Sequence, residues 1–392
     1  MEYRIEEGET QMSKKIYAVI GMWSGGLYLC DYHEESGQMT PIGLFGEKEI
    51  KCGQSFWDQK HQLLYATDEV SGRNALGGGG YATAWKIDSE KDTLSEFSRR
   101  CTLSENPSWI CLEPSGAYAL VTHFCAHWSG YTKIVQQPDG TYSSRVDVCD
   151  DALVLMRMNP DGSFGDVCDV VIHRGSGKPG PGATPHLHSV VCDPSGELFT
   201  VCDMGTDQVF SYRLNRKAGK LQFLDSFRAE DGAEPRLEVF DPNGQYLYTN
   251  NEGRPEVYSF RYSTSSGALE RICVCPTLPQ EMRPEGRPFS PSDLILSPDA
   301  RYLYTTIRVA DQISVLRVEK NGQVTRLQSV SSEGKKPKGI ALSPDGEYLF
   351  SANGESGTVT QFRVNADGTL KYLSIAADLG GSPGNISFIT LK

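Results

Sequence analysis

Short runs of alternating apolar and polar residues recur along most of this chain. Each run spans four to seven residues, is rich in Tyr, Phe, Val, Ile and Thr, and ends at a turn such as Asp-Gly or Ser-Gly. A period near two predicts β-strands joined by tight turns, and it excludes helices for most of the chain.

One longer phrase returns several times: a proline, a few increasingly hydrophobic residues, a second turn and an aromatic strand. Its copies start at residue 106 (NPSWICLEPSGAYAL), 184 (TPHLHSVVCDPSGELF), 234 (EPRLEVFDPNGQYLY), 290 (SPSDLILSPDARYLY) and 336 (KPKGIALSPDGEYLF). The leading prolines are 78, 50, 56 and 46 residues apart. A repeat of roughly 40 to 55 residues built from short strands is typical of a β-propeller, in which each repeat forms one four-stranded blade.

The two ends of the chain complete the blade count. A weaker copy of the phrase starts at Lys51, and SPGNISFITL near the C-terminus contains an inner-strand phrase with nothing after it. Residues 15–43 supply three strands that lack an inner partner. We therefore predict an all-β, seven-bladed propeller with four-stranded antiparallel blades, closed by pairing of residues 386–391 with residues 16–21. Residues 15–392 form one predicted domain, and residues 1–14 are a predicted disordered extension.

Two segments depart from the regular spacing. The long step after Pro107 predicts an extra hairpin within residues 127–151. The glycines at 77–80 lengthen a turn of the second blade. A phosphate-binding glycine loop needs a helix after it, and here a strand follows, so we interpret this run as a hairpin tip.

Charge and cysteine usage narrow the function classes. The formal charge is −12 and the pI about 5.2, which argues against nucleic acids and anionic membranes as partners. The sequence contains no apolar run of about 18 residues. Most of the 11 cysteines lie in strand phrases, as do Cys111, Cys125, Cys192 and Cys202, which favours reduced thiols and a cytoplasmic protein. We expect a monomer or weak homo-oligomer.

Chemistry-bearing residues gather just after the repeat prolines, where the inner strands line a shared channel. Aligning the copies there gives Trp109, His186, His188, Arg236, Glu238, Asp293 and Lys338. The ends of the following strands add a second set, which includes Asp68-Glu69, His123-Phe124, Glu252 and Arg308. Cys273 and Cys275 form no CxxC pair, and the His186/His188 pair has no third ligand at suitable spacing, so we expect neither a metal nor a cofactor.

The phrase that follows Gly175, with its PHLHSV core, resembles the lactonase family of seven-bladed propellers, which includes bacterial 6-phosphogluconolactonase and the fungal carboxymuconate cyclase. Further similar phrases are EPRLEVFDPNGQYLYTNNE, YLYTTIR, the copy at residue 336 and SPGNISFITL. The resemblance implies that His188, Arg236, Glu252 and Arg308 are catalytic. His186, Asp293, Lys338 and Trp109 are candidates for binding the substrate. Relatives commonly have a histidine where this chain has Leu237, which leaves the substrate open.

These residue types suit the opening of a small anionic lactone. The reaction needs a base for water and positive charge at the carbonyl oxygen. Either Glu252 or His188 could be the base, Arg236 and Arg308 could bind the oxyanion, and Lys338 is a candidate for phosphate. Alternatively, Arg236 is only an ion-pair partner of Glu252. A cycloisomerase acting on a muconate-like diacid and a non-catalytic binding propeller are the alternative functions.

Overall fold

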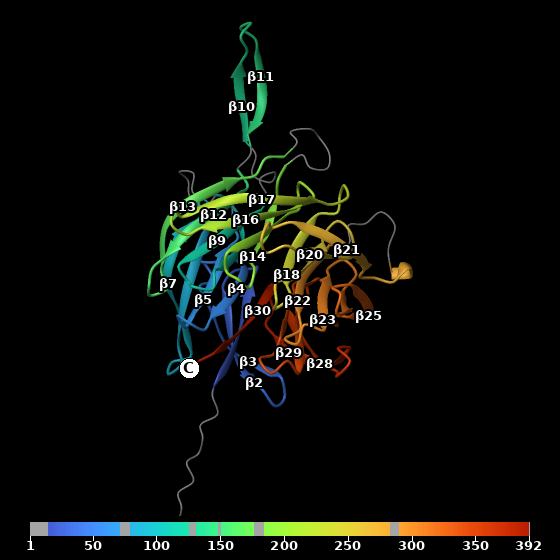
Figure 1. Ribbon diagram of the computed structural model, residues 1–392. Helices are drawn as coiled ribbons and strands as arrows, with labels where there is room; N and C mark the ends of the chain where they lie inside the picture. Colours follow the sequence, from blue (N-terminus) through green and yellow to red (C-terminus); the bar gives the residue numbers. More distant parts are fainter. Residues whose placement is uncertain are drawn as a thin grey trace, which may run out of the picture.

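Seven four-stranded antiparallel sheets follow one another around a ring (Figure 1). The computed structural model describes residues 15–70, 79–124, 131–147, 150–175, 184–282 and 290–391. The predicted extension at residues 1–14 and half of the 77–80 glycine run lie outside these ranges. The seven-bladed propeller predicted from the repeats is confirmed.

Each blade contributes an inner, two middle and an outer strand, and they are given in that order here. The blades are β30 (Pro383–Thr390), β1 (Ile16–Met22), β2 (Leu27–His33), β3 (Gln38–Phe45); β4 (Cys52–Asp58), β5 (Leu63–Asp68), β6 (Tyr81–Asp88), β7 (Thr93–Cys101); β8 (Pro107–Leu112), β9 (Tyr118–His123), β12 (Ala152–Met158), β13 (Phe164–Ile172); β14 (Leu187–Cys192), β15 (Leu198–Asp203), β16 (Gln208–Asn215), β17 (Lys220–Arg228); β18 (Pro235–Phe240), β19 (Tyr246–Asn251), β20 (Glu256–Tyr262), β21 (Leu269–Pro276); β22 (Pro291–Leu296), β23 (Tyr302–Ile307), β24 (Gln312–Val318), β25 (Val324–Ser331); and β26 (Pro337–Leu342), β27 (Tyr348–Asn353), β28 (Thr358–Val364), β29 (Leu370–Asp378). A short 3₁₀ helix, η2 (Gln280–Met282), follows the fifth blade.

The C-terminal strand closes the ring. Strand β30 pairs antiparallel with β1, with Ile16 opposite Thr390 and Ile20 opposite Ile386. The inner strands contact one another in the order β30, β4, β8, β14, β18, β22, β26 and back to β30. The predicted pairing of the two chain ends is therefore confirmed, and the first blade has no free inner edge.

One blade carries an insertion. Strands β10 (Tyr131–Gln136) and β11 (Tyr142–Asp147) pair only with each other and lie in the chain between β9 and β12. Figure 1 shows this hairpin standing away from the ring. The extra hairpin predicted within residues 127–151 is confirmed.

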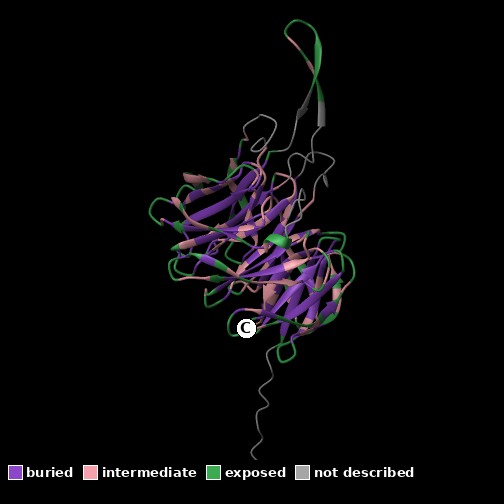
Figure 2. Ribbon diagram, turned by 90° about the vertical axis from the view of Figure 1, so that its right-hand side faces the viewer, coloured by how far each residue is buried: buried purple, intermediate pink, exposed green. Residues whose placement is uncertain are grey.

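The hydrophobic core consists of a series of interfaces between neighbouring blades. Tyr17 and Val19 on β1 pack with Leu64 and Ala66 on β5, and equivalent clusters lie between the other blades. Buried residues run through the strands, whereas the connecting turns are exposed (Figure 2). Because each blade buries its apolar faces against two neighbours, one ring can extend beyond the usual size of a single core.

The nine described cysteines are all free thiols. Cys111, Cys192 and Cys202 lie in strands, as predicted, and Cys125 is outside the described residues. Among the residues that the structure describes, no helix is long and apolar enough to cross a membrane.

Candidate active site at the mouth of the channel

A cavity of about 380 Å³ opens where the inner strands begin. Its lining includes His188, Arg236, Glu252 and Arg308, which come from three blades, so the structure brings these four predicted residues together. Trp109, Asp293 and Lys338 also line it. The remaining lining residues are Trp23, Gly53, Gln54, Ser55, Glu69, Ser108, Phe124, Leu237, Ser292, Ile295, Ile340, Gly384, Asn385 and Ile386.

The repeat proline builds a corner that positions these side chains. In four blades the residue before the proline has a positive φ of 48° to 58°, a conformation rare for residues other than glycine. The four residues are Asn106, Glu234, Ser290 and Lys336. The carbonyl of each accepts a hydrogen bond from the backbone N–H of the residue that follows the second strand, over 2.7–3.1 Å. The corner thus ties the start of the inner strand to the end of its neighbour.

The residues fixed by these corners form a second ring around the channel. Phe124 follows β9, Glu252 follows β19 and Arg308 follows β23, and each donates its backbone N–H to a corner carbonyl. Ring closure adds Trp23, which follows β1 and donates to the carbonyl of Ser382 at 2.7 Å, directly before Pro383. Glu69, after β5, occupies the corresponding place in the second blade.

A carboxylate held between two guanidinium groups dominates one side of the cavity. Nε of Arg236 donates to Oε2 of Glu252 at 2.7 Å, and Nη2 of Arg308 donates to Oε1. Nη1 of Arg236 also donates to the carbonyl of Ser292, and Nε of Arg308 donates to the carbonyl of Ser290 at 3.3 Å. Both oxygens of Glu252 therefore accept charge-assisted hydrogen bonds, and the two arginines are fixed by them.

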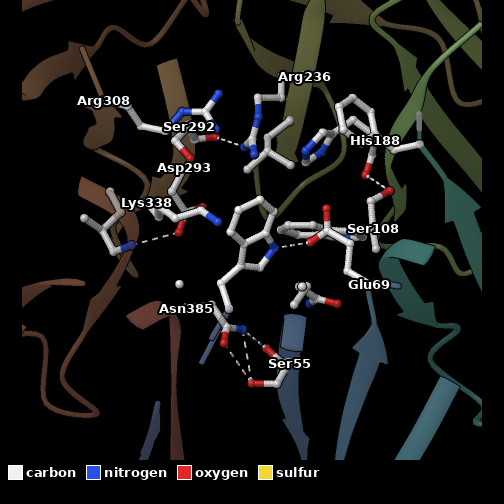
Figure 3. Close-up of a pocket in the computed structure, with 18 of the residues that line it drawn as sticks. Ser55, Glu69, Ser108, His188, Arg236, Ser292, Asp293, Arg308, Lys338 and Asn385 are labelled. Atoms are coloured by element: carbon white, nitrogen blue, oxygen red, sulfur yellow. Dashed lines mark hydrogen bonds between the residues drawn. The ribbon is translucent and has the colours of Figure 1, made fainter. Parts of the chain in front are cut away.

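His188 lies beside these arginines and points into the cavity (Figure 3). Burial lowers the pKa of its imidazole well below the usual value, and the charges of Arg236, Arg308 and Lys338 lower it further. Nδ1 is buried and has no hydrogen-bond partner among the described residues. The histidine is therefore neutral at pH 7 and can accept a proton.

Trp23, Glu69 and Lys338 approach the cavity from other blades. The indole Nε1 of Trp23 donates to Oε2 of Glu69 at 2.8 Å. Nζ of Lys338 lies 3.4 Å from the centre of the Trp23 ring, and Nζ of Lys51 lies 4.1 Å from it. Burial lowers the pKa of Lys338 to about 7, against the opposing effect of Glu69.

Asp293 has a structural task in this wall. Its Oδ2 accepts the backbone N–H of Ile340 on the neighbouring blade at 2.8 Å, and its Oδ1 accepts that of Leu294. Burial raises the pKa of the Asp293 carboxyl. The bond from Ile340 joins β22 to β26, the strand that also contains Lys338.

A second glutamate lies in the layer behind the lining. Glu238 is 4% exposed, and burial raises its pKa to about 8. The hydroxyl of Ser189 lies within hydrogen-bond distance of both Oε2 of Glu238 and the carbonyl of Arg236, the latter at 2.7 Å. One hydroxyl has one proton, so a protonated Glu238 can donate from Oε2 to Ser189, which in turn donates to the carbonyl of Arg236. Oε1 of Glu238 is buried and has no hydrogen-bond partner among the described residues. This chain of hydrogen bonds links β14 to β18 directly behind His188 and Arg236.

The structure does not place His186 in the cavity lining. The strand register shifts between Leu187 and Ser189, just after His186. His186 lies 3.4 Å from the hydroxyl of Thr184, and the rings of His186 and His188 both contact the ring of Phe124, which lines the cavity. The predicted role of His186 in binding the substrate stays a prediction.

Sequence reasoning missed several lining residues. Trp23 and Asn385 come from the two strands that close the ring, so neither stood next to a complete copy of the repeat phrase. The predicted ring closure could have identified Trp23. It makes β1 the second strand of its blade, so Trp23, which follows β1, occupies the position that Glu252 has in the fifth blade. Asn385 donates through Nδ2 to the hydroxyl of Ser55 at 3.1 Å and joins the first blade to the second.

Within the described ranges, no group of three or more His, Cys, Asp or Glu side chains is arranged to hold a metal ion. The carboxylates of Glu69, Glu252 and Asp293 instead accept hydrogen bonds from other residues of this wall.

Comparison with known proteins agrees with this geometry. A family model described as lactonase, seven-bladed β-propeller, matches residues 17–388. The chain belongs to this lactonase family. It is 23% identical over 282 residues to a 6-phosphogluconolactonase of Bacillus subtilis, an alignment that covers 72% of this chain and 71% of the relative. A 6-phosphogluconolactonase of Formosa agariphila is 24% identical over 221 residues, which cover 55% of this lactonase-family chain and 54% of the relative.

Solved structures show the same fold. The periplasmic gluconolactonase of Pseudomonas aeruginosa superimposes with a TM-score of 0.79 at 23% identity, covering 96% of this lactonase-family chain and all of the other. At this level of identity the superposition supports the propeller architecture alone.

Proposed function

We propose that this protein hydrolyses a sugar lactone of the 6-phosphogluconolactone type without a metal ion. Membership of the lactonase family and the names of the two bacterial relatives support the reaction class. The observation that carries the proposal is the cavity itself, in which a neutral histidine faces two arginines fixed by one carboxylate. A cavity that gathers several polar and charged side chains in this way favours catalysis over a purely scaffolding propeller.

His188 is the proposed general base. Both oxygens of Glu252 are engaged with guanidinium donors, whereas the imidazole is neutral and faces the cavity. His188 takes a proton from water, and the resulting hydroxide adds to the lactone carbonyl to give a tetrahedral anion. Collapse of this anion breaks the ring C–O bond, and the proton returns from His188 to the leaving alkoxide. The product is the open hydroxy acid.

The arginines supply the positive charge that the tetrahedral anion needs. The hydrogen bonds described above use Nε and Nη1 of Arg236 and Nε and Nη2 of Arg308. One terminal nitrogen of each guanidinium is left for the oxyanion. Glu252 acts here as a positioning residue that holds both cations in place before the substrate arrives.

The test is acid release from 6-phosphogluconolactone, gluconolactone and a muconolactone, each corrected for spontaneous hydrolysis. The proposal expects acceleration on the sugar lactones that exceeds that on the muconolactone, and its loss in His188→Gln. Rates equal to the spontaneous reaction on all three would overturn it. Formation of a lactone from a muconate diacid, with no hydrolysis of sugar lactones, would support the cycloisomerase instead.

The cellular location, oligomeric state and partners of the protein are a further part of the proposal. We propose a cytoplasmic protein that acts as a monomer or weak homo-oligomer on a small anionic lactone, independent of nucleic acid and membranes. The free thiols of the nine cysteines that the structure describes and the net charge of −12 support this. Cell fractionation and sedimentation of the purified protein test it. Recovery from the periplasm or a stable large assembly would contradict it.

A further inference from the structure

We propose that Lys338, stacked on Trp23, is the subsite for the phosphate group of the substrate, and that the phosphate binds together with a proton. This inference rests on the proposed function and assigns a part of the substrate to a part of the cavity. It begins from an asymmetry among the three cations that line the cavity, Arg236, Arg308 and Lys338.

The two arginines are already committed to partners. They share Glu252, and each also donates to a backbone carbonyl. In the described part of the chain, no hydrogen bond or ion pair engages Nζ of Lys338, which contacts only the face of the Trp23 ring, at 3.4 Å. Its three N–H donors are therefore available to an incoming anion.

The charges around Lys338 determine how readily its side chain is protonated. Desolvation of this half-buried side chain and the charges of Arg308, Arg236 and Lys336 disfavour the ammonium form, whereas Glu69 favours it. With its pKa lowered to about 7, Lys338 loses its proton more readily than an ordinary lysine does. Trp23 and Lys51 adjoin it from the first and second blades, and Asp293 and His188 line the same cavity.

An anion bound beside Nζ of Lys338 would offset the excess of positive charge around this lysine. A phosphate group within reach of Nζ supplies the negative charge that the lysine lacks, so its pKa should rise and the site should take up a proton on binding. Trp23 would orient the ammonium group, since Nζ rests on one face of the indole and the Nε1–H is held by Glu69. The remaining terminal nitrogen of each arginine would then serve the lactone carbonyl. Figure 3 shows the three cations around one space.

The first experiment measures binding of the reaction product, which does not hydrolyse further. Titration calorimetry with 6-phosphogluconate and with gluconate, in two buffers of different ionisation enthalpy at pH 7, reports both affinity and proton uptake. Wild-type protein should bind the phosphorylated acid roughly ten- to a hundredfold more tightly and take up a fraction of a proton. Lys338→Met should lose most of that preference. The phosphate titrates in both proteins, so the difference in proton uptake belongs to Lys338.

Lys51→Met is the matched control. Lys51 also stacks on Trp23, but it does not line the cavity. The proposal expects Lys51→Met to keep the preference for 6-phosphogluconate. An equal loss in both variants would overturn it, because the effect would then come from disturbance of Trp23 rather than from a direct contact.

Kinetics separate this proposal from the proposed function. Lys338→Met should raise the KM for 6-phosphogluconolactone roughly ten- to a hundredfold, with a smaller change in kcat and a smaller effect on gluconolactone. If wild-type protein hydrolyses the phosphorylated lactone and Lys338→Met does so with the same KM, the subsite is wrong and the function stands. If no lactone is hydrolysed but the product binds as described, the subsite stands and the reaction is wrong. Equal binding of gluconate and 6-phosphogluconate by the wild type would overturn the subsite.

Discussion

Two neighbouring layers of the channel wall each contain a glutamate, and the two glutamates differ in their partners and in their charge. At the cavity, Glu252 is clasped by Arg236 and Arg308, so its charge is paired. One layer behind, Glu238 faces only the hydroxyl of Ser189 and the thiol of Cys202, with Cys111 farther on, and burial raises its pKa to about 8. The same side chain is an anion where it organises cations and a neutral donor where it joins strands.

The difference shows how a strand can serve chemistry and stability at once. Arg236 and Glu238 are separated by one residue on β18, and His188 and Ser189 are adjacent on β14. The first member of each pair lines the cavity, whereas Ser189 and Glu238 meet in a hydrogen bond between the two blades. Substitutions in the cavity layer should therefore affect turnover, whereas substitutions in the layer behind it should affect stability.

The largest effect on turnover is expected for His188→Gln. This change removes the base and keeps a polar side chain, so hydrolysis should fall about a hundredfold or more. In the wild type, activity should also fall at acid pH with an apparent pKa below 6.5, because burial and the nearby cations lower the pKa of His188. The rate against pH, on protein whose fold is checked by circular dichroism, tests this. A variant with the wild-type rate and acid limb would remove His188 from the mechanism.

A loss of about tenfold to a hundredfold is expected for Glu252→Gln, which keeps the shape of the side chain and removes its charge. The arginines then lose their shared anion, and their positions at the carbonyl relax. Glu238→Gln is the matched control, since it makes the same chemical change one layer back and should leave turnover near the wild-type value at pH 7. Similar losses in both variants would contradict the division between the layers. If Glu252→Gln instead abolished the acid limb, Glu252 would be the base.

A loss of about tenfold is expected for Arg236→Lys. Lysine keeps the charge, but it cannot donate to Glu252 and to the carbonyl of Ser292 from one planar group. The measurement is kcat and KM for gluconolactone, with protein stability as the control. Full activity would mean that only the charge of Arg236 matters.

The smallest effect on turnover and a clear effect on stability are expected for Glu238→Gln. The folded-state pKa of Glu238, about 8, exceeds the ordinary value of 4.5. The unfolded chain therefore releases the proton first, and the free energy of unfolding of the wild type should fall as pH rises from about 4.5 to about 8. Glutamine does not titrate, so the variant should become more stable than the wild type across this window, by a few kcal/mol at most. Urea denaturation at pH 5, 7 and 8.5 measures the difference, and a constant offset would contradict it.

The repeat pattern was sufficient to predict the fold and a set of channel residues, and the resemblance to the lactonase family selected His188, Arg236, Glu252 and Arg308 from that set. Proline phrases mark the inner strands, so Arg236 and Lys338 could be aligned across blades before any coordinates were known. The positive φ before four of these prolines explains why the alignment extends to Glu252 and Arg308, which the same corners hold. Such backbone geometry leaves no mark in the periodicity of hydrophobic residues.

Other features depended on contacts that the alternation of side chains does not encode. The strand register shifts in β14 just after His186, and of the two histidines only His188 lines the cavity. The link between Ser189 and Glu238 joins two blades, and so does the stacking of Lys338 on Trp23. A chain read one repeat at a time does not show which residues of neighbouring repeats meet.

The closing strand has a consequence for how the protein is made. Translation delivers β1 first and β30 last, so the first blade waits for its inner strand until the other six have emerged from the ribosome. Until then the cavity lacks Asn385, and the backbone of Trp23 lacks the carbonyl of Ser382 that anchors it. A nascent or prematurely terminated chain would carry most of the blades without a complete active site. Enzymatic competence would begin only when β30 pairs with β1.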